Sequence, residues 1–539
     1  MNLYPIPYTH ARTKRPQRPM SLKFAFCCLL IMLFLLSGCA QQGVTSSTPS
    51  EVQTKATESI QKTTALPTAT EVNEVNEATD PSTLNIDNDG GNFSQDDLIY
   101  FVVTDRFKRS EENEVLGDVN PDDPYAYHGG NLRGVTESLD YIKSLGTTAI
   151  WLTPVQKNGP KGYHGYWIYD FWSVDPHLGT LDDLKNLVRE AHKRDIKVLM
   201  DYVVNHTGYD TPWFNDPQKK QWFNPKRTIT NWNDEKQLER GWLFGLPDLN
   251  LDKPEVTQFF IDNALWWIRE TGIDGMRLDT VKHVPRSFWT TWNHAIKTEF
   301  PDFYLLGEVW SEHVSILERY RDVGIDGVTN YPLYEGLTSA LSKTGRVTDL
   351  ANAIARDQSF SGSKISGIFV DNHDNSRLIS KDPIHGKAYL KLGLVWAYTY
   401  PAIPILYYGT EVGLEGGKDP DNRRDMPWSN VPHPDLLALT KSLANWRASA
   451  NNSYAWLYHD DQMAIYLRSD ALVVLNFSDQ PVSFSIPLSD VALTDLATQK
   501  INAYSLDSEQ APILNWAREQ QTLSGTFKPF EYGIYPLVP

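Results

Sequence analysis

The chain has 539 residues, a formal net charge of −17 and 12% aromatic residues, including 17 tryptophans. A chain of this length exceeds one compact core, so we expect a large domain with a smaller companion. The acidic balance argues against a polyanionic partner such as nucleic acid. The only cysteines, Cys27, Cys28 and Cys39, lie near the N-terminus, so no disulfide is expected within the folded domains.

Residues 1–38 have the pattern of an export signal. Basic side chains precede an uncharged run from Phe24 to Leu36, which is shorter than the roughly 20 residues that span a bilayer. Residues 36–39 read Leu-Ser-Gly-Cys and resemble a bacterial lipobox, which predicts cleavage before Cys39 and lipidation of that cysteine. A plain secretory signal is the alternative, and Met20 is an alternative start. We therefore expect an exported protein, held on the cell envelope outside the cytoplasm by a lipid in the membrane.

Residues 39–94 are rich in Thr, Ser, Glu, Asn and Gln and contain a single aromatic residue, Phe93. Such a stretch cannot bury enough apolar surface to offset its ordering entropy. We expect a disordered tether that reaches on the order of 40 Å as a coil.

From Leu98 onward, short apolar runs alternate with amphipathic stretches, as in a parallel sheet with crossover helices. Eight runs are predicted strands: Ile99–Val103, Thr148–Leu152, Lys197–Met200, Gly275–Leu278, Phe303–Leu306, Gly327–Asn330, Gly367–Val370 and Ile403–Leu406. Eight is the strand number of a (β/α)8 TIM barrel, an α/β fold that we assign to residues 95–434.

Two further regions flank this pattern. About fifty residues rich in Trp, Asn and Pro separate the third run from a helix that starts near Pro254, which is too long for an ordinary loop. We expect a small inserted subdomain at 207–253. After a last barrel helix from Asp435 to Arg447, the remaining runs predict a C-terminal antiparallel β-sandwich within 435–539. Its first strands are expected at 463–467, 471–475 and 482–486.

Three segments, GMRLDTVKH (275–283), YLLGE (304–308) and FVDNHD (369–374), each combine an apolar run with a following carboxylate. The carboxyl ends of barrel strands form the active-site face, so these carboxylates can converge on one substrate. Two carboxylates suffice for retaining glycoside hydrolysis, because one attacks the anomeric carbon while the other protonates the leaving oxygen and then activates water. The pattern predicts a glycosidase.

Two more segments precede these three, DYVVNH (201–206) and LPDLN (246–250). In this order and spacing, all five resemble the segments that define the α-amylase family, glycoside hydrolase family 13, over roughly Ile99 to Trp428. The resemblance implies double displacement at α-1,4-glucosidic bonds of an α-glucan, in starch-like polymers and maltooligosaccharides. It implies no organic cofactor.

The carboxylates receive distinct roles. Asp279 is the predicted nucleophile, and Arg277, two residues back, points to the same side of the strand and favours its ionised form. Glu308 is the predicted acid/base, which requires a raised pKa. The resemblance implies that Asp374 binds sugar hydroxyls and helps to distort the ring.

The resemblance also implies sugar contacts from four basic side chains. His206 and His373 match histidines that hydrogen-bond the sugar being cleaved. Lys282 and His283 match residues that contact the sugar on the leaving-group side.

Two other stretches are similar to substrate-binding loops of the family. In YHGYW (163–167), Tyr166 is expected to stack on the sugar being cleaved, with Trp167 nearby. Asp419 and Arg423 are expected to bind terminal sugars on the non-reducing side. The alternatives are a core aromatic for Tyr166 and a salt-bridged surface turn for the pair.

Calcium is an open expectation. Many amylases hold a structural Ca²⁺ here through Asn205, the position of Asn250 and the carbonyl of His283, but calcium-binding relatives commonly have Asp at that second position. Calcium prefers six to eight oxygens with several carboxylates. A second site is a loop that could equally be solvated, with Asn113, Asp118, Asn120, Asp122 and Asp123.

Specificity stays open among related activities. Leu246 stands where relatives active on α-1,6 bonds often have Gln and others have Met, which favours α-1,4 cleavage. Cyclomaltodextrinase-like or neopullulanase-like hydrolysis and glycosyl transfer are alternatives, because the same intermediate serves all of them. A non-catalytic glycan-binding surface lipoprotein is a further alternative, although all three carboxylates are present. The sequence identifies no protein partner.

Overall fold

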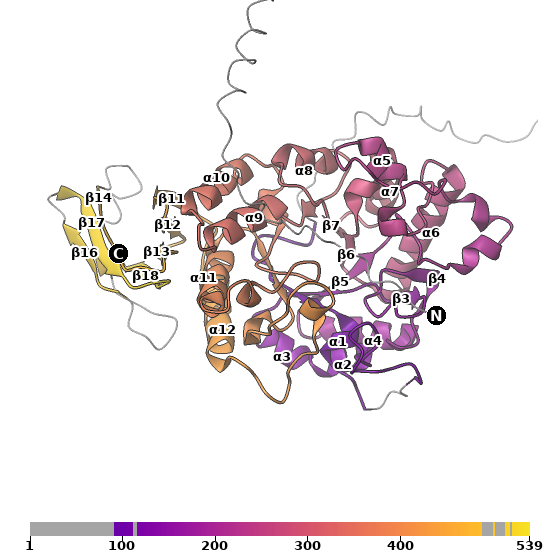
Figure 1. Ribbon diagram of the computed structural model, residues 1–539, viewed down its shortest axis with the longest axis horizontal. Helices are drawn as coiled ribbons and strands as arrows, with labels where there is room; N and C mark the ends of the chain where they lie inside the picture. Colours follow the sequence, from indigo (N-terminus) through magenta and orange to yellow (C-terminus); the bar gives the residue numbers. More distant parts are fainter. Residues whose placement is uncertain (1–90, 112–115, 488–499, 502–511, 518–519, 539) are drawn as a thin grey trace, which may run out of the picture. The chain divides into compact units, whose positions relative to one another are not determined.

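The structure is a computed structural model that describes residues 91–111, 116–487, 500–501, 512–517 and 520–538 (Figure 1). The predicted signal and all but the last four residues of the predicted tether lie outside the described residues. Within the described ranges, no helix combines the length and the apolar character needed to cross a bilayer.

A closed barrel of eight parallel strands forms the centre of the described chain (Figure 1). In space the strands follow the order β8-β7-β6-β5-β2-β1-β10-β9, and a parallel bridge between Thr329 and Gly367 joins the two ends. Their bounds are β1 Ile99–Val102, β2 Ala149–Leu152, β5 Lys197–Tyr202, β6 Gly275–Leu278, β7 Tyr304–Gly307, β8 Gly327–Val328, β9 Gly367–Ile368 and β10 Ile403–Tyr407. The predicted TIM barrel is confirmed.

The strands are continuous apolar runs because helices cover their outer face while other side chains fill the barrel. All four residues of β2 and all four of β7 are buried. The covering helices include α2 Leu132–Glu137, α3 Leu139–Lys143, α4 Leu181–His192, α6 Pro254–Thr271, α7 Arg286–Glu299, α8 Val314–Arg321, α9 Tyr331–Ala340, α10 Val347–Asp357, α11 Gly386–Thr399 and α12 Pro434–Ser449.

Local signals set the ends of these helices. Thr180 caps α4 reciprocally, since its hydroxyl accepts from the Asp183 N–H at 3.2 Å while the Asp183 carboxylate accepts from the Thr180 N–H at 2.9 Å. At the C-terminal end of α6, Gly272 adopts the left-handed conformation with φ 71°. Such caps fix where each crossover turns back to the sheet.

The long connections after β2 and β5 carry short elements. Strands β3 (Gln156–Asn158) and β4 (Ile168–Val174) pair antiparallel. Bridges pair His206 with Asp248 and Phe223 with Leu249, so the start and end of the second connection lie together. The elements between them are η2 Pro212–Asn215, η3 Lys219–Gln221, α5 Glu235–Arg240 and η4 Leu243–Gly245.

The C-terminal part is an antiparallel sandwich of two sheets, as predicted. One sheet has the order β11-β12-β13-β18-β15 and the other β14-β17-β16. Apolar side chains of both sheets, such as Ile465 and Phe484, form one buried cluster. The bounds are β11 Tyr454–His459, β12 Met463–Arg468, β13 Ala471–Asn476, β14 Val482–Pro487, β15 Lys500–Ile501, β16 Leu514–Ala517, β17 Thr522–Phe527 and β18 Tyr532–Val538.

Gly327 tests the closure of the barrel. A Cβ atom on this β8 residue would overlap the carbonyl oxygen of Ile365 and lie 2.6 Å from the Tyr304 hydroxyl. We expect Gly327→Ala to lower the free energy of unfolding by about 1–3 kcal/mol in urea denaturation. Gly117→Ala is the control, because no atom lies within 4 Å of its added Cβ. Equal stability of the two variants would contradict close packing of β8 where the barrel closes.

Candidate active site

The predicted catalytic segments meet at the carboxyl ends of neighbouring strands. The register pairs Asp201, near the end of β5, with Arg277 of β6. Asp279 follows β6 directly, and Glu308 follows β7 directly. Asp374 lies farther out, in the loop after β9. Three adjacent strands therefore supply the charged centre of the site.

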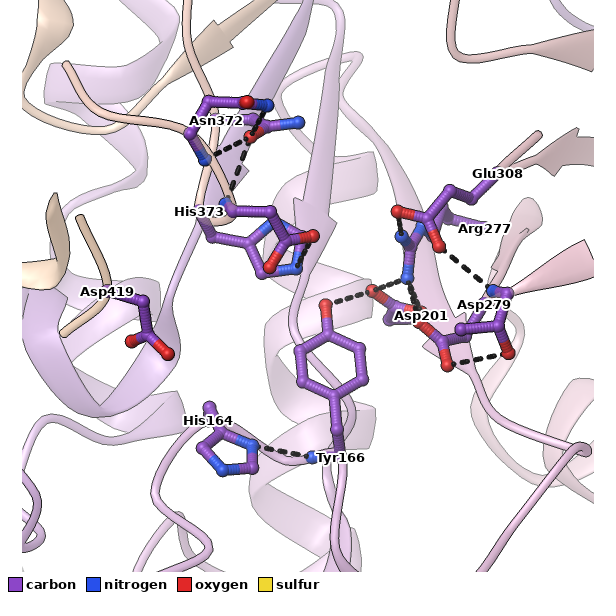
Figure 2. Close-up of polar contacts among 12 residues, drawn as sticks. His164, Tyr166, Asp201, Arg277, Asp279, Glu308, Asn372, His373 and Asp419 are labelled. Carbon is purple, nitrogen blue, oxygen red and sulfur yellow. Dashed lines mark hydrogen bonds and ion pairs between the residues drawn. The ribbon is translucent and has the colours of Figure 1, made fainter. Parts of the chain in front are cut away.

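Arg277 is the hub of this centre (Figure 2). Its Nη1 atom lies 2.9 Å from Asp201 Oδ1 and 2.8 Å from Asp279 Oδ1, and its Nη2 atom lies 2.6 Å from Glu308 Oε1. All four side chains are buried. A single guanidinium thus faces three carboxylates away from water.

One positive charge cannot balance three buried negative charges. Carboxyl groups in this cluster therefore keep their protons to a higher pH than carboxyl groups in water do. Burial raises the pKa of Glu308 to about 8, and the negative charges of Asp279 and Asp374 act in the same direction against Arg277. Burial likewise raises the pKa of Asp201 to about 7. Glu308 therefore carries a proton at neutral pH, as a general acid requires.

Asp279 is held on both of its oxygens. Arg277 donates to Oδ1, and the Thr280 hydroxyl donates to Oδ2 at 3.2 Å. The Thr280 N–H donates to Glu308 Oε2 at 2.9 Å. Thr280 has a left-handed backbone, φ 46° and ψ 39°, which is strained for a β-branched residue. The turn after β6 thus holds the predicted nucleophile and the predicted acid together.

Tyr166 and His373 form a wall beside these carboxylates (Figure 2). The Tyr166 hydroxyl donates to Asp201 Oδ2 at 2.7 Å, and its ring stacks on His373 with centroids 5.3 Å apart. Burial, reinforced by the charges of Arg423 and Arg277, holds the pKa of His373 well below its ordinary value. A neutral imidazole suits hydrogen bonding to a sugar hydroxyl without proton transfer.

His206 and Trp167 border the same wall. His206 Nε2 lies 3.2 Å from the carbonyl oxygen of Tyr166, so this nitrogen carries the proton, and burial lowers the pKa of the ring. The Trp167 ring meets the edges of His164 and Tyr209. His206 therefore lies beside Tyr166, and Trp167 follows Tyr166 directly in the chain.

Arg423 connects Asp374 with Asp419. Its Nη2 atom lies 3.2 Å from Asp374 Oδ1, and its Nη1 atom lies 3.1 Å from Asp419 Oδ1. In Figure 2, Asp419 lies across Tyr166 and His373 from Glu308. The pair is salt-bridged and also faces the site at this end.

Lys282 and His283 belong to the short helix η5 (Val281–His283), which follows Asp279 in the chain. Lys282 Nζ donates to the carbonyl oxygen of Trp310 at 2.7 Å, and burial lowers its pKa. Burial also lowers the pKa of His283 to about 4, and its Nδ1 atom lies 3.2 Å from the Leu238 carbonyl oxygen. His283 is therefore neutral.

Asp201 is a functional residue that the sequence reasoning did not assign. It accepts from both Arg277 and Tyr166, so it orients the guanidinium and the stacking ring. The signal was present, because the run 197–200 also ends in a carboxylate.

Three exposed rings near the site were also missed. Trp232 and Phe244 lie with centroids 5.9 Å apart, and Trp232 is 6.2 Å from His283. Trp310 stacks on Tyr331 at 4.8 Å. They are 46%, 62% and 46% exposed in that order, and exposure of an aromatic ring has no sequence signal.

Comparison with known proteins agrees with this geometry. The model of the α-amylase catalytic domain matches residues 101–455. This protein belongs to the α-amylase family. It is a glycoside hydrolase of that family, with a barrel and a C-terminal sandwich.

Individual relatives of the α-amylase family span most of the chain. A β/α-amylase of Paenibacillus polymyxa is 36% identical over 70% of this chain, which spans about a third (33%) of that longer protein. A cyclomaltodextrinase of a Bacillus species is 33% identical over 71% of this chain and 73% of its own length. The crystal structure of an Anoxybacillus α-amylase is 40% identical, with a TM-score of 0.75 over 83% of this chain and 98% of that one.

The calcium position expected from the family contains converging polar groups. With its nitrogen turned toward them, the Asn205 amide donates to the His283 carbonyl oxygen at 2.8 Å and to Asp248 Oδ1 at 3.2 Å. In the opposite orientation, three oxygens face one another, as they do around a cation. Asp248 is fully buried, burial raises its pKa well above the ordinary value, and its side-chain partner is the neutral amide of Asn224. This donor set fits a cation.

The other residues expected at metal sites have different partners. Asn250 Oδ1 accepts from the Asp252 N–H, and Asp248 stands at the position facing Asn205. In the acidic loop, Asp118 pairs with His177 and Asp123 with Lys161, while Asn113 lies outside the described residues. Among described residues, no three His, Cys, Asp or Glu side chains cluster as metal ligands.

The raised pKa of Glu308 predicts the alkaline limit of activity. We expect kcat/KM for a soluble glycoside to fall with a midpoint near pH 8, because the general acid loses its proton there. Asp374→Asn removes a charge that raises this pKa, so the midpoint of its residual activity should move to lower pH. An unchanged midpoint in a measured pH profile would contradict this coupling.

Proposed function

We propose that this protein is a retaining hydrolase of α-1,4-glucosidic bonds in starch-like polymers and maltooligosaccharides. The observation that carries the proposal is the contrast between two carboxyl groups on one guanidinium. Asp279 is held by Arg277 and the Thr280 hydroxyl, and Glu308 keeps a proton up to about pH 8. One group is set for attack and the other for proton donation.

In the first half-reaction, an Asp279 oxygen attacks the anomeric carbon while Glu308 gives its proton to the leaving glycosidic oxygen. Tyr166 supplies a ring face for the sugar, and the neutral His373 offers hydrogen bonds beside Asp374. A covalent glycosyl-enzyme results, with the leaving chain released.

In the second half-reaction, the ionised Glu308 takes a proton from water as the water oxygen attacks the anomeric carbon. The bond between that carbon and Asp279 breaks, and its electron pair returns to the carboxylate. The product keeps the α-configuration because the anomeric centre is inverted twice.

Glycosyl transfer is a second candidate activity, favoured by the exposed rings. Trp232 lies beside His283 and Phe244 beside Trp232, while Lys282 donates to the Trp310 carbonyl oxygen. Lys282 and His283 mark the leaving-group side by family resemblance. Exposed aromatic faces there bind an incoming sugar as readily as a departing one. The similarity to a cyclomaltodextrinase supports cyclic maltodextrins as additional substrates.

We also propose that the enzyme is exported and anchored through Cys39. The lipobox-like segment 36–39 supports this, and it lies outside the described residues. A tethered hydrolase would act on glucans outside the cytoplasm.

A structural calcium ion is proposed at Asn205, Asp248 and the His283 carbonyl. A cation there would offset the buried charge of Asp248 and link the inserted connection to the turn after β6, with no part in the chemical steps. His283 lies four residues after Asp279, so the ion would act on the shape of the site.

Removal of calcium should lower thermal stability. The pKa of Asp248 is raised in the fold, so its ionised form destabilises the fold above the unfolded pKa unless a cation is bound. Calcium at roughly 100 times Kd should add about 2.7 kcal/mol, seen as a higher Tm than in chelator. Asp248→Asn, which has no charge to bury, should respond much less. An equal rise in Tm with calcium for Asp248→Asn and the unaltered protein would contradict a calcium site at Asp248.

Proton NMR of soluble starch with the protein tests the proposed function. We expect α-anomeric products first, with activity reduced about a hundred- to ten-thousandfold in Glu308→Gln, the range that a general acid and base contributes. Product lengths distinguish internal from terminal cleavage, and added maltose reveals transfer. Initial β-anomers would contradict retention, and absence of products from any α-glucan would favour a glycan-binding protein.

A further inference from the structure

Thr280 contacts both catalytic carboxyl groups, and neither the family segments nor the comparisons give it a role. Its hydroxyl donates to Asp279 Oδ2 at 3.2 Å, and its N–H donates to Glu308 Oε2 at 2.9 Å. The hydroxyl therefore touches the carboxylate of the proposed nucleophile.

The backbone of this residue explains why the hydroxyl lies there. Thr280 occupies the left-handed region, φ 46° and ψ 39°, in which glycine is favoured and β-branched residues are rare. Its carbonyl accepts from the His283 N–H at 2.7 Å, and the Val281 N–H donates to the Glu308 carbonyl oxygen at 3.1 Å. These bonds hold the turn in its strained form. Strained residues of this kind concentrate at functional sites.

The hydroxyl does not act equally on the two half-reactions. In the proposed mechanism Asp279 attacks as a negatively charged carboxylate, and this charge is lost in the glycosyl ester. A hydrogen bond to Asp279 is therefore strongest in the free enzyme and weakest in the ester, since bonds to charged groups are the stronger ones. The bond is lost as the ester forms and is regained as negative charge returns to Asp279 in the second half-reaction.

We propose that Thr280 is a catalytic residue of the second half-reaction, in which its hydroxyl stabilises the departing Asp279 carboxylate. This rests on the proposed retaining mechanism. As water attacks the anomeric carbon, the bond from that carbon to the Asp279 oxygen breaks, and its electron pair stays on the carboxylate. The water proton goes to Glu308, and Thr280 keeps its own proton and donates only a hydrogen bond.

The proposal predicts opposite effects on the two steps. Thr280→Val keeps the β-branch and the N–H but removes the hydroxyl. We expect deglycosylation to slow by about three- to tenfold, in line with a partly formed bond to a charged group, while formation of the glycosyl-enzyme is unchanged or faster. The covalent intermediate should accumulate.

The experiment uses α-maltosyl fluoride, whose good leaving group makes the first step fast. Rapid quenching and mass spectrometry of the intact protein give the fraction of glycosyl-enzyme, and fluoride release gives the rates. Thr280→Ser restores the hydroxyl and should return deglycosylation to within about twofold of the original enzyme, because the same hydrogen bond can form. Thr280→Gly relieves the backbone strain without a hydroxyl, so it should show the slow second step of the valine variant.

The possible outcomes distinguish failure of this proposal from failure of the proposed function on which it rests. Equal slowing of both steps in Thr280→Val, or normal deglycosylation in Thr280→Gly, would overturn a role for the hydroxyl. A covalent adduct in the unaltered enzyme with no increase in Thr280→Val or Thr280→Gly would overturn it too. Absence of fluoride release from the unaltered, folded enzyme would instead refute the proposed hydrolase function, because neither step then occurs. Circular dichroism and Tm show that each variant is folded.

Discussion

A shortage of positive charge governs the centre of this molecule. Arg277 is buried among Asp201, Asp279 and Glu308, and it contacts all three. Burial makes each ionised carboxyl group costly, and one guanidinium compensates only part of that cost. A proton therefore remains in the cluster at neutral pH, and the raised pKa of Glu308 places it on the group that must donate it. The proposed division of roles between Asp279 and Glu308 follows from this imbalance.

The barrel makes the imbalance possible by fixing where the charges lie. The parallel register sets Asp201 beside Arg277, and adjacent strands β5, β6 and β7 deliver the remaining groups at one end. Because helices and packed side chains keep water from the strands, the carboxyl groups cannot relax their repulsion by solvation. A flexible loop could supply the same residues, but it would not hold them dry and close together.

Much of this arrangement could be read from the chain, because buried parallel strands leave continuous apolar runs and catalytic carboxylates follow them directly. The strands and the positions of Asp279 and Glu308 are examples. Asp201 also follows an apolar run directly, but the sequence assigned it no role. The sequence alone could not show that Phe244 is exposed, because phenylalanine occurs in cores as well as on surfaces. Nor could it show that Asp248, rather than Asn250, faces Asn205, because that depends on how one loop folds back.

The barrel closes between β8 and β9, and this junction is held more weakly than the rest of the sheet. Strands β8 and β9 have two residues each, and one bridge between Thr329 and Gly367 joins them. Few hydrogen bonds must break to open the structure there, so local unfolding is cheapest at this place. The loop after β9 carries His373 and Asp374, whereas Arg277 lies on β6, which is separated from β8 by β7 and flanked by the longer strands β5 and β7. Warming would therefore loosen the loop with His373 and Asp374 before it separates Arg277 from its carboxylates.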